Sequence, residues 1–155
     1  MALAGLSTLG VTFGYGTEST AGTKPAPFTQ LTRINQIGAI SLENQQIDAS
    51  ALEDLVTKNI AGRADTPGNV GVTINLTDDT KSEWETLIST YKALTGGKQM
   101  WFEIIIPNMT ESYFFIAQPP QEIPSPEMGQ NELLTVEITL TIVDVKAFDT
   151  KVAFT

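Results

Sequence analysis

The sequence predicts a mainly β fold, an antiparallel sandwich or barrel-like sheet that carries one packed α-helix. Several segments alternate apolar and polar side chains with a period of two, as half-buried strands do, and the longest runs over residues 134–145. Only one segment, at about 80–95, repeats its apolar side chains at helical spacing. With 155 residues and 41% apolar content, residues 1–155 are expected to form a single domain with a substantial core.

The first 27 residues are expected to form an arm and a linker, followed by the sandwich over residues 28–155. Alternating apolar side chains in the arm predict a strand, and these are Leu9, Val11, Phe13 and Tyr15. The linker, 17–27, is rich in Thr, Ala, Gly, Ser and Pro and has little to bury. A terminal strand needs a sheet edge, so two interpretations stay open: it closes an edge of its own domain, or it pairs with a neighbouring subunit.

The middle of the chain predicts short strands around a loop region. Two strand-like runs within 28–47 are separated near Gly38. Residues 48–61 mix helix formers with Asp, Ser, Thr and Asn, and residues 62–69 are rich in turn residues, so a turn of helix and an exposed loop are expected. Residues 70–77 alternate again and predict a strand with one buried face.

The helix expected at about 80–95 has recognisable ends. Thr80 and Glu83 have the spacing of a capping box, and Gly96-Gly97 supplies a left-handed stop. Its apolar side chains form a stripe that should pack on the sheet, namely Trp84, Leu87, Ile88, Tyr91 and Leu94.

Three further strands are predicted at 100–106, 113–117 and 134–145, with a Pro-rich loop before the last. Aromatic residues in these strands are expected to pack in the core, because no basic residues interleave with them as in a nucleic-acid platform. The last strand has one fully apolar face. Its opposite face is formed by Thr135, Glu137, Thr139 and Thr141.

The composition excludes many kinds of chemistry. The chain has no His and no Cys, so it lacks an imidazole base, a thiolate nucleophile and the usual zinc ligands, and neither an enzyme nor a cofactor or metal site is expected. Nine Lys and Arg stand against 18 Asp and Glu, a net charge of -9 that disfavours tight binding to nucleic acid or an anionic membrane. The first residues do not form a signal peptide, so synthesis in the cytosol is expected.

Several stretches, taken in order, resemble the tail tube proteins of long-tailed, non-contractile bacteriophages. They are Ala2 to Gly10, Ile47 to Asp54, Gly62 to Gly68 with the Val-rich strand after it, the helix of Trp84, and Asn131 to Val136. The likeness covers nearly the whole chain, and its weight comes from order, length and composition together.

This resemblance implies a structural virion protein, the major tail protein. Its subunits would self-assemble into hexameric rings that stack into a helical tube, a conduit for DNA ejection, with an N-terminal arm and long loops bridging successive rings. The implied partners are the chain itself, the tape measure protein, the tail terminator and tail-tip proteins. DNA would pass without specific binding, no membrane would be involved, and the protein would reside in the phage tail after assembly in the host cytoplasm.

A negative lumen would repel passing phosphates. We therefore hypothesise that the face of Thr135, Glu137, Thr139 and Thr141 borders that lumen, the alternative being an ordinary solvated outer face. A second function class also stays open, a monomeric β-sandwich module of a bacterial surface protein that binds a carbohydrate or a protein. The tube hypothesis further expects that deleting residues 1–16 leaves a folded domain that no longer forms long tubes.

Overall fold

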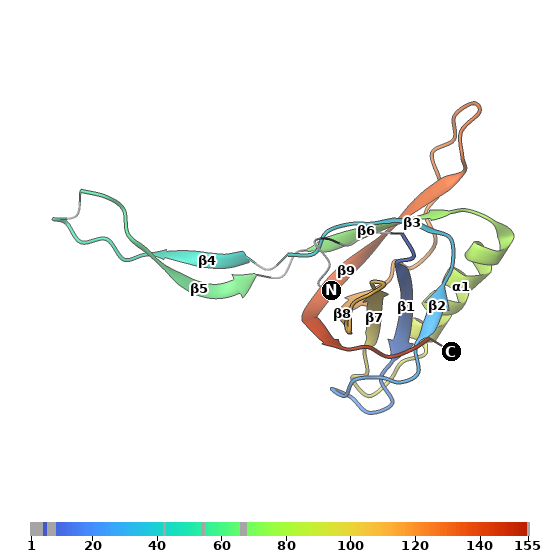
Figure 1. The fold of residues 1–155 in the computed structure, drawn as a ribbon, viewed down its shortest axis with the longest axis horizontal. Coiled ribbons are helices and arrows are strands. Elements are labelled where there is room, and N and C mark those ends of the chain that lie inside the picture. The colour runs from blue at the N-terminus through green and yellow to red at the C-terminus, as the bar shows by residue number, and fades with distance from the viewer. Residues whose placement is uncertain (1–4, 6–8, 42, 54, 66–67, 155) are drawn as a thin grey trace.

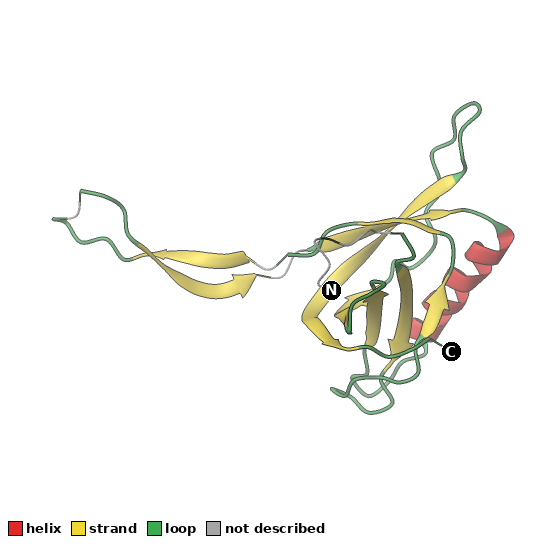
Figure 2. Cartoon of the chain, viewed as in Figure 1, coloured by secondary structure: helices red, strands yellow, loops and turns green. Residues whose placement is uncertain are grey.

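The computed structural model describes residues 5, 9–41, 43–53, 55–65 and 68–154, which form nine strands and one helix (Figures 1 and 2). In chain order the elements are β1 (Thr12–Thr17), β2 (Thr29–Leu31), β3 (Ile34–Ile37), β4 (Glu43–Asp48), β5 (Asn59–Asp65), β6 (Asn69–Asn75), α1 (Asp78–Lys92), β7 (Met100–Ile105), β8 (Glu111–Gln118) and β9 (Thr135–Thr150).

Seven strands form one sheet in the order β2-β1-β7-β8-β9-β6-β3, and every neighbouring pair is antiparallel. Its two edges, β2 and β3, are separated in sequence only by Thr32 and Arg33, so the sheet must curl until its edges lie close together (Figure 1). The mainly β antiparallel class with one helix is therefore confirmed, in the barrel-like form of the prediction.

Strand β9 shows the predicted alternation. Val136, Ile138 and Leu140 are buried, while Glu137 and Thr139 between them are exposed. Alternation survives because β6 pairs with β9 in an unbroken register, with Val72 opposite Ile138 and both side chains on the core face.

The helix begins earlier than expected. Thr77 is its N-cap, and the capping box joins Thr77 to Thr80: the Thr77 N–H donates to Thr80 Oγ1 over 2.8 Å and the Thr80 N–H donates to Thr77 Oγ1 over 3.3 Å. The expected box of Thr80 with Glu83 is wrong, because the Glu83 carboxylate accepts the Thr32 N–H over 3.2 Å. Glu83 thus ties the helix to the connection between β2 and β3.

The predicted apolar stripe of α1 lies against the inner face of the sheet. Trp84, Leu87 and Ile88 are buried in the main core, and Tyr91 and Leu94 pack against it half-buried. The core itself combines this stripe with the inward side chains of β1, β6, β7, β8 and β9. The helix therefore covers one open side of the curled sheet (Figure 2).

The expectation that residues 1–27 form a separate arm and linker needs correction. Strand β1 is an internal strand of the chain's own sheet, paired with β2 on one side and β7 on the other, and Phe13 and Tyr15 are core residues. Both backbone edges of β1 are used, so it cannot add to a neighbouring subunit in this fold. Of the four arm residues, only Leu9 is largely exposed, at 85%, and Val11 is half-buried.

The linker is also anchored to the sheet. Glu18 is buried, and its carboxylate accepts the Gln99 N–H over 2.7 Å, the Trp101 Nε1–H over 3.1 Å and the Gly22 N–H over 3.1 Å. A buried carboxylate that accepts several N–H groups is well compensated for its burial. The described residues 9–27 therefore belong to the same body as the sheet.

A second cluster of buried side chains lies on the other face of the sheet and includes Phe28, Trp101, Phe114 and Ile116, with Val152 and Phe154 packed against it. Aromatic residues of β7 and β8 thus pack in cores, as the sequence predicted. The C-terminal segment covers this cluster, and the Val152 N–H donates to Glu103 Oε2 over 3.0 Å. Burial raises the pKa of the Glu103 carboxyl.

The turn of helix expected within 48–61 is wrong. Strands β4 and β5 form an antiparallel hairpin joined by the loop 49–58, and they make a separate two-stranded sheet. The described side chains of both strands face solvent almost throughout. Because neither face of this hairpin is buried, apolar and polar residues do not alternate along its sequence. The Pro-rich segment between β8 and β9 is a loop, as predicted.

Candidate functional site

The β4–β5 hairpin is the feature of this fold that most needs a partner. It projects away from the curled sheet, with its loop at the far end from the body (Figure 1). It pairs with no strand of the seven-stranded sheet. Because an isolated two-stranded hairpin is marginally stable in water, a surface that covers it would stabilise it.

Apolar side chains are concentrated on this hairpin although it has no core. Ile47 and Ile60 form an exposed cross-strand pair close to its loop, while Leu52 and Leu55 at its tip are fully exposed and Val56 is 73% exposed. Single exposed apolar residues are ordinary, but a group of them on a thin projection marks an interaction surface. We call residues 49–58 the hairpin tip.

Hydrogen bonds hold the base of the tip in one arrangement. The Ala49 N–H donates to the Lys58 carbonyl oxygen over 2.7 Å, and the Lys58 N–H donates to Ser50 Oγ over 2.7 Å. The Ser50 N–H donates to Asp48 Oδ1 over 2.9 Å, and hydrogen bonding from Ser50 lowers the pKa of the Asp48 carboxyl. The tip is thus partly preorganised for contact, which lowers the entropic cost of binding.

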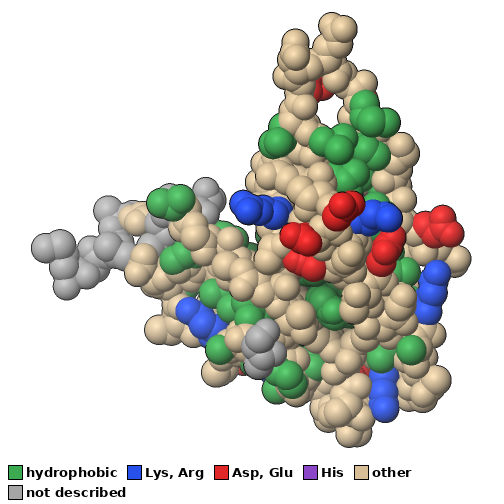
Figure 3. Space-filling model, turned by 90° about the vertical axis from the view of Figure 1, so that its right-hand side faces the viewer, with side chains coloured by type: hydrophobic (Ala, Val, Ile, Leu, Met, Phe, Trp, Pro, Cys, Tyr) green, Lys and Arg blue, Asp and Glu red, His purple; other side chains and the backbone are tan. Residues whose placement is uncertain are grey.

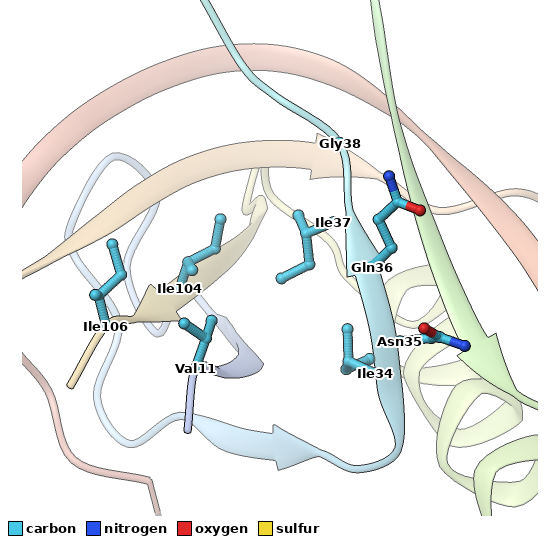
Figure 4. A pocket seen from close by; sticks show the side chains of 8 residues that line it. All are labelled: Val11, Ile34, Asn35, Gln36, Ile37, Gly38, Ile104 and Ile106. Atoms are coloured by element: carbon cyan, nitrogen blue, oxygen red, sulfur yellow. The ribbon is translucent and has the colours of Figure 1, made fainter. Parts of the chain in front are cut away.

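An apolar groove opens on the body between the edge strand β3 and the neighbouring ends of β1 and β7. Figure 4 shows side chains of β3, of the residue just before β1 and of the end of β7 and the residue after it pointing into the groove, while Asn35 and Gln36 point away. The groove has a volume of about 430 Å³. We call it the seam groove, and its apolar lining consists of Val11, Ile34, Ile37, Ile104 and Ile106.

All five lining side chains are half-buried, and three of them, Ile34, Ile37 and Ile104, also pack against the main core. The groove is continuous with a second hollow of about 630 Å³ that shares Val11 and Ile34. Arg33 and Asp79 line that hollow, so it adds charge to one end of an apolar surface.

The face proposed to border a lumen is present as a surface. Glu137, Thr139 and Thr141 are exposed, Thr135 is half-buried, and the Glu137 side chain lies across Gly71 of β6, where an added Cβ would approach the carboxylate oxygen to 2.6 Å. On another side of the molecule, around the helix, acidic and basic side chains intermingle (Figure 3). Ion pairs there include Lys81 with Glu85 at 3.5 Å.

Other kinds of site find little support in the part of the chain that the structure describes. That part contains no group of three acidic or other ligating side chains that could hold a metal ion. Within the same residues, no helix combines the length and apolar character needed to cross a membrane. Of the aromatic side chains described, only Phe148 is exposed, and it packs edge-on against Tyr113.

The predicted site residues fall into three separate places: the helix stripe in the core, the former arm residues in or beside β1, and the polar face on β9. The hairpin tip and the seam groove were missed. The available signal was Leu52, Leu55 and Val56 standing without alternation in a polar segment, a pattern that suits exposed contact residues better than a core helix.

No protein-family model and no characterised protein sequence matches this chain. Solved structures share its fold, among them the following two. One is a chain in the six-fold symmetrised baseplate of the anti-feeding prophage (AFP), with a TM-score of 0.59, 14% identity, and coverage of 95% of this chain and 97% of that chain. The other is a chain in the C6-symmetric tail of an empty GTA particle, with a TM-score of 0.53, 14% identity, and coverage of 80% and 86%.

At 14% identity these likenesses establish a common fold, which is that of chains in two phage-like particles. Neither is described as part of a long-tailed, non-contractile phage, so that part of the expectation stays a prediction.

Proposed function

We propose that this chain is a structural subunit of a phage-type tail that self-assembles into hexameric rings stacked into a tube, through which DNA is ejected. The observation that carries the proposal is the β4–β5 hairpin, whose apolar tip projects from the body and contacts no core. Such a projection gives an assembly one apolar contact for every subunit that it adds.

The structural comparisons also support an assembly of repeated subunits. Chains with this fold belong to a baseplate and a tail that both have six-fold symmetry. Repeated subunits need a surface that extends from one copy to the next, because a head-to-tail contact repeated along an axis gives an open filament. The hairpin supplies a projection suited to that contact.

The charge of the chain fits a conduit. We propose that one face of β9 lines the tube interior, where a net negative surface would repel the phosphates of passing DNA. This face consists of Thr135, Glu137, Thr139 and Thr141. A map of the assembled tube tests this placement directly. Glu137 on the outer wall of the tube would contradict it.

Purified chain should form uniform hollow tubes or rings in negative-stain electron micrographs as its concentration rises. The double variant Leu52→Ser/Leu55→Ser should remain folded, because both side chains are fully exposed, yet assemble far less. Burying one leucine contributes about 1.5–3 kcal/mol. The concentration needed for half-assembly should therefore rise about 10²- to 10⁴-fold.

The matched control is Leu55→Met, which keeps an apolar side chain of similar volume and should assemble like the unmodified chain. Circular dichroism melts check that every variant is folded. Particles that stay single for the unmodified chain at all concentrations and salt conditions would contradict the proposal and favour the monomeric binding module. We further propose that, as in the tail tube resemblance, the tape measure, terminator and tail-tip proteins bind the assembled tube.

A further inference from the structure

We infer that the seam groove is the receptor for the hairpin tip of a second copy of this chain. The inference rests on the proposed function, since it assigns a partner surface to the hairpin that the function requires. Both the tip and the groove are built mainly from aliphatic side chains that water can reach.

The tip cannot occupy the groove of its own molecule. The hairpin extends away from the curled sheet, so its loop lies at the far end from the body that carries the groove (Figure 1). The occupant must come from another copy. A contact between unlike surfaces of identical chains is head-to-tail, and it can repeat without limit.

The two surfaces are compatible in size and in apolar character. The groove is about 430 Å³ and is lined by five half-buried aliphatic side chains, from the residue before β1, from β3, and from the end of β7 and the residue after it (Figure 4). The tip offers Leu52, Leu55 and Val56, all largely exposed. A pocket of a few hundred Å³ with an apolar lining suits a small number of aliphatic side chains.

Charge gives the contact a direction. Glu53 stands beside Leu52 at the tip and is exposed, and Arg33 is exposed in the hollow that continues the groove. A tip that fills the groove with its leucines brings Glu53 toward that hollow. Asp79 lines the same hollow, so exchanging the two charges is more informative than removing either one.

The absence of cysteine from the sequence makes a direct test possible. The double variant Leu55→Cys/Ile37→Cys places one thiol on the tip and one in the groove. Under mild oxidation, assembled protein should give a ladder of covalent oligomers on a denaturing gel, and reductant should remove it. The matched control, Leu55→Cys/Val143→Cys, carries its second thiol on β9 outside the groove and should give no ladder.

A charge exchange provides a second measurement that does not depend on cysteine. Arg33→Glu alone and Glu53→Arg alone should each raise the half-assembly concentration about 5- to 30-fold, and the combined variant should restore most of the loss. Tubes that form normally while the groove pair gives no ladder would overturn the groove as receptor and leave the proposed function standing. A combined charge variant no better than the single ones would also overturn it. Failure of the unmodified chain to assemble would overturn both proposals.

Discussion

Replacing Phe13 by alanine distinguishes a core role of strand β1 from a role in assembly. The Phe13 side chain is fully buried, and its ring stacks on Phe102 at 5.6 Å and on Phe115 at 6.3 Å between centroids. Removing a buried Phe costs about 3–5 kcal/mol, and loss of the aromatic pairs adds to the upper part of that range. For a chain of this size we expect Phe13→Ala to lower Tm by about 6–20 °C.

The measurement is a thermal or urea melt of the variant beside Leu9→Ala. Leu9 is 85% exposed, so its truncation should change the free energy of unfolding by no more than about 0.5 kcal/mol. From the sequence, deletion of residues 1–16 was expected to leave a folded domain. Because this deletion removes most of the internal strand β1, we now expect it to unfold the body. If Phe13→Ala melted like the unmodified chain but formed no tubes, the assignment of β1 to the core would be refuted.

Three further predictions concern the body. Burial raises the pKa of Glu103 above its ordinary value of 4.5, so the folded state keeps this carboxyl protonated to a higher pH than the unfolded state does. The free energy of unfolding should therefore fall as pH rises from about 4.5 through the raised pKa. Melts between pH 4.5 and 7.5 should show this fall disappearing in Glu103→Gln, and an unchanged pH profile would contradict it. A Cβ on Gly14 would clash with the Phe154 ring, so Gly14→Ala should cost about 1–3 kcal/mol and expose the C-terminal segment to carboxypeptidase. The control is Gly68→Ala, whose added Cβ would meet no atom within 4 Å. Thr77→Ala removes the N-cap oxygen and should cost about 1 kcal/mol in urea melts, whereas Thr90→Ala within the helix should cost less.

The elements that the sequence predicted well are those with one solvent-exposed face and one buried face. Strand β9 and helix α1 have that asymmetry, because each packs on the core along one side only. Their side chains therefore repeat with periods of two and of three to four, and the pattern can be read without the structure.

Strand β1 was misjudged because both of its faces are covered. Gly14 and Gly16 suggested an unburied side, yet an added Cβ at either position would contact an aromatic ring, that of Phe154 or of Phe28. Glycine stands there because another part of the chain comes close, and a single sequence does not distinguish that from exposure. In β4 and β5, by contrast, both faces are exposed to water. Such strands need no alternation of apolar and polar residues, and the sequence therefore does not mark them as strands.

The candidate site was therefore the least predictable part of the chain. The seam groove joins Val11 and Ile104 to Ile34 and Ile37, which come close only when the sheet curls. No local pattern in the sequence specifies that proximity. Only the exposed apolar residues of the tip gave a signal, and their use depends on a second molecule.

The position of β9 in the sheet has a consequence for the timing of synthesis. It is the last strand described, and it alone connects β2-β1-β7-β8 to β6-β3. The two walls of the seam groove belong to these two halves, so a nascent chain lacks a finished receptor until β9 has left the ribosome and inserted. The tips of completed neighbours would then find no groove to occupy on a chain whose β9 has not yet inserted.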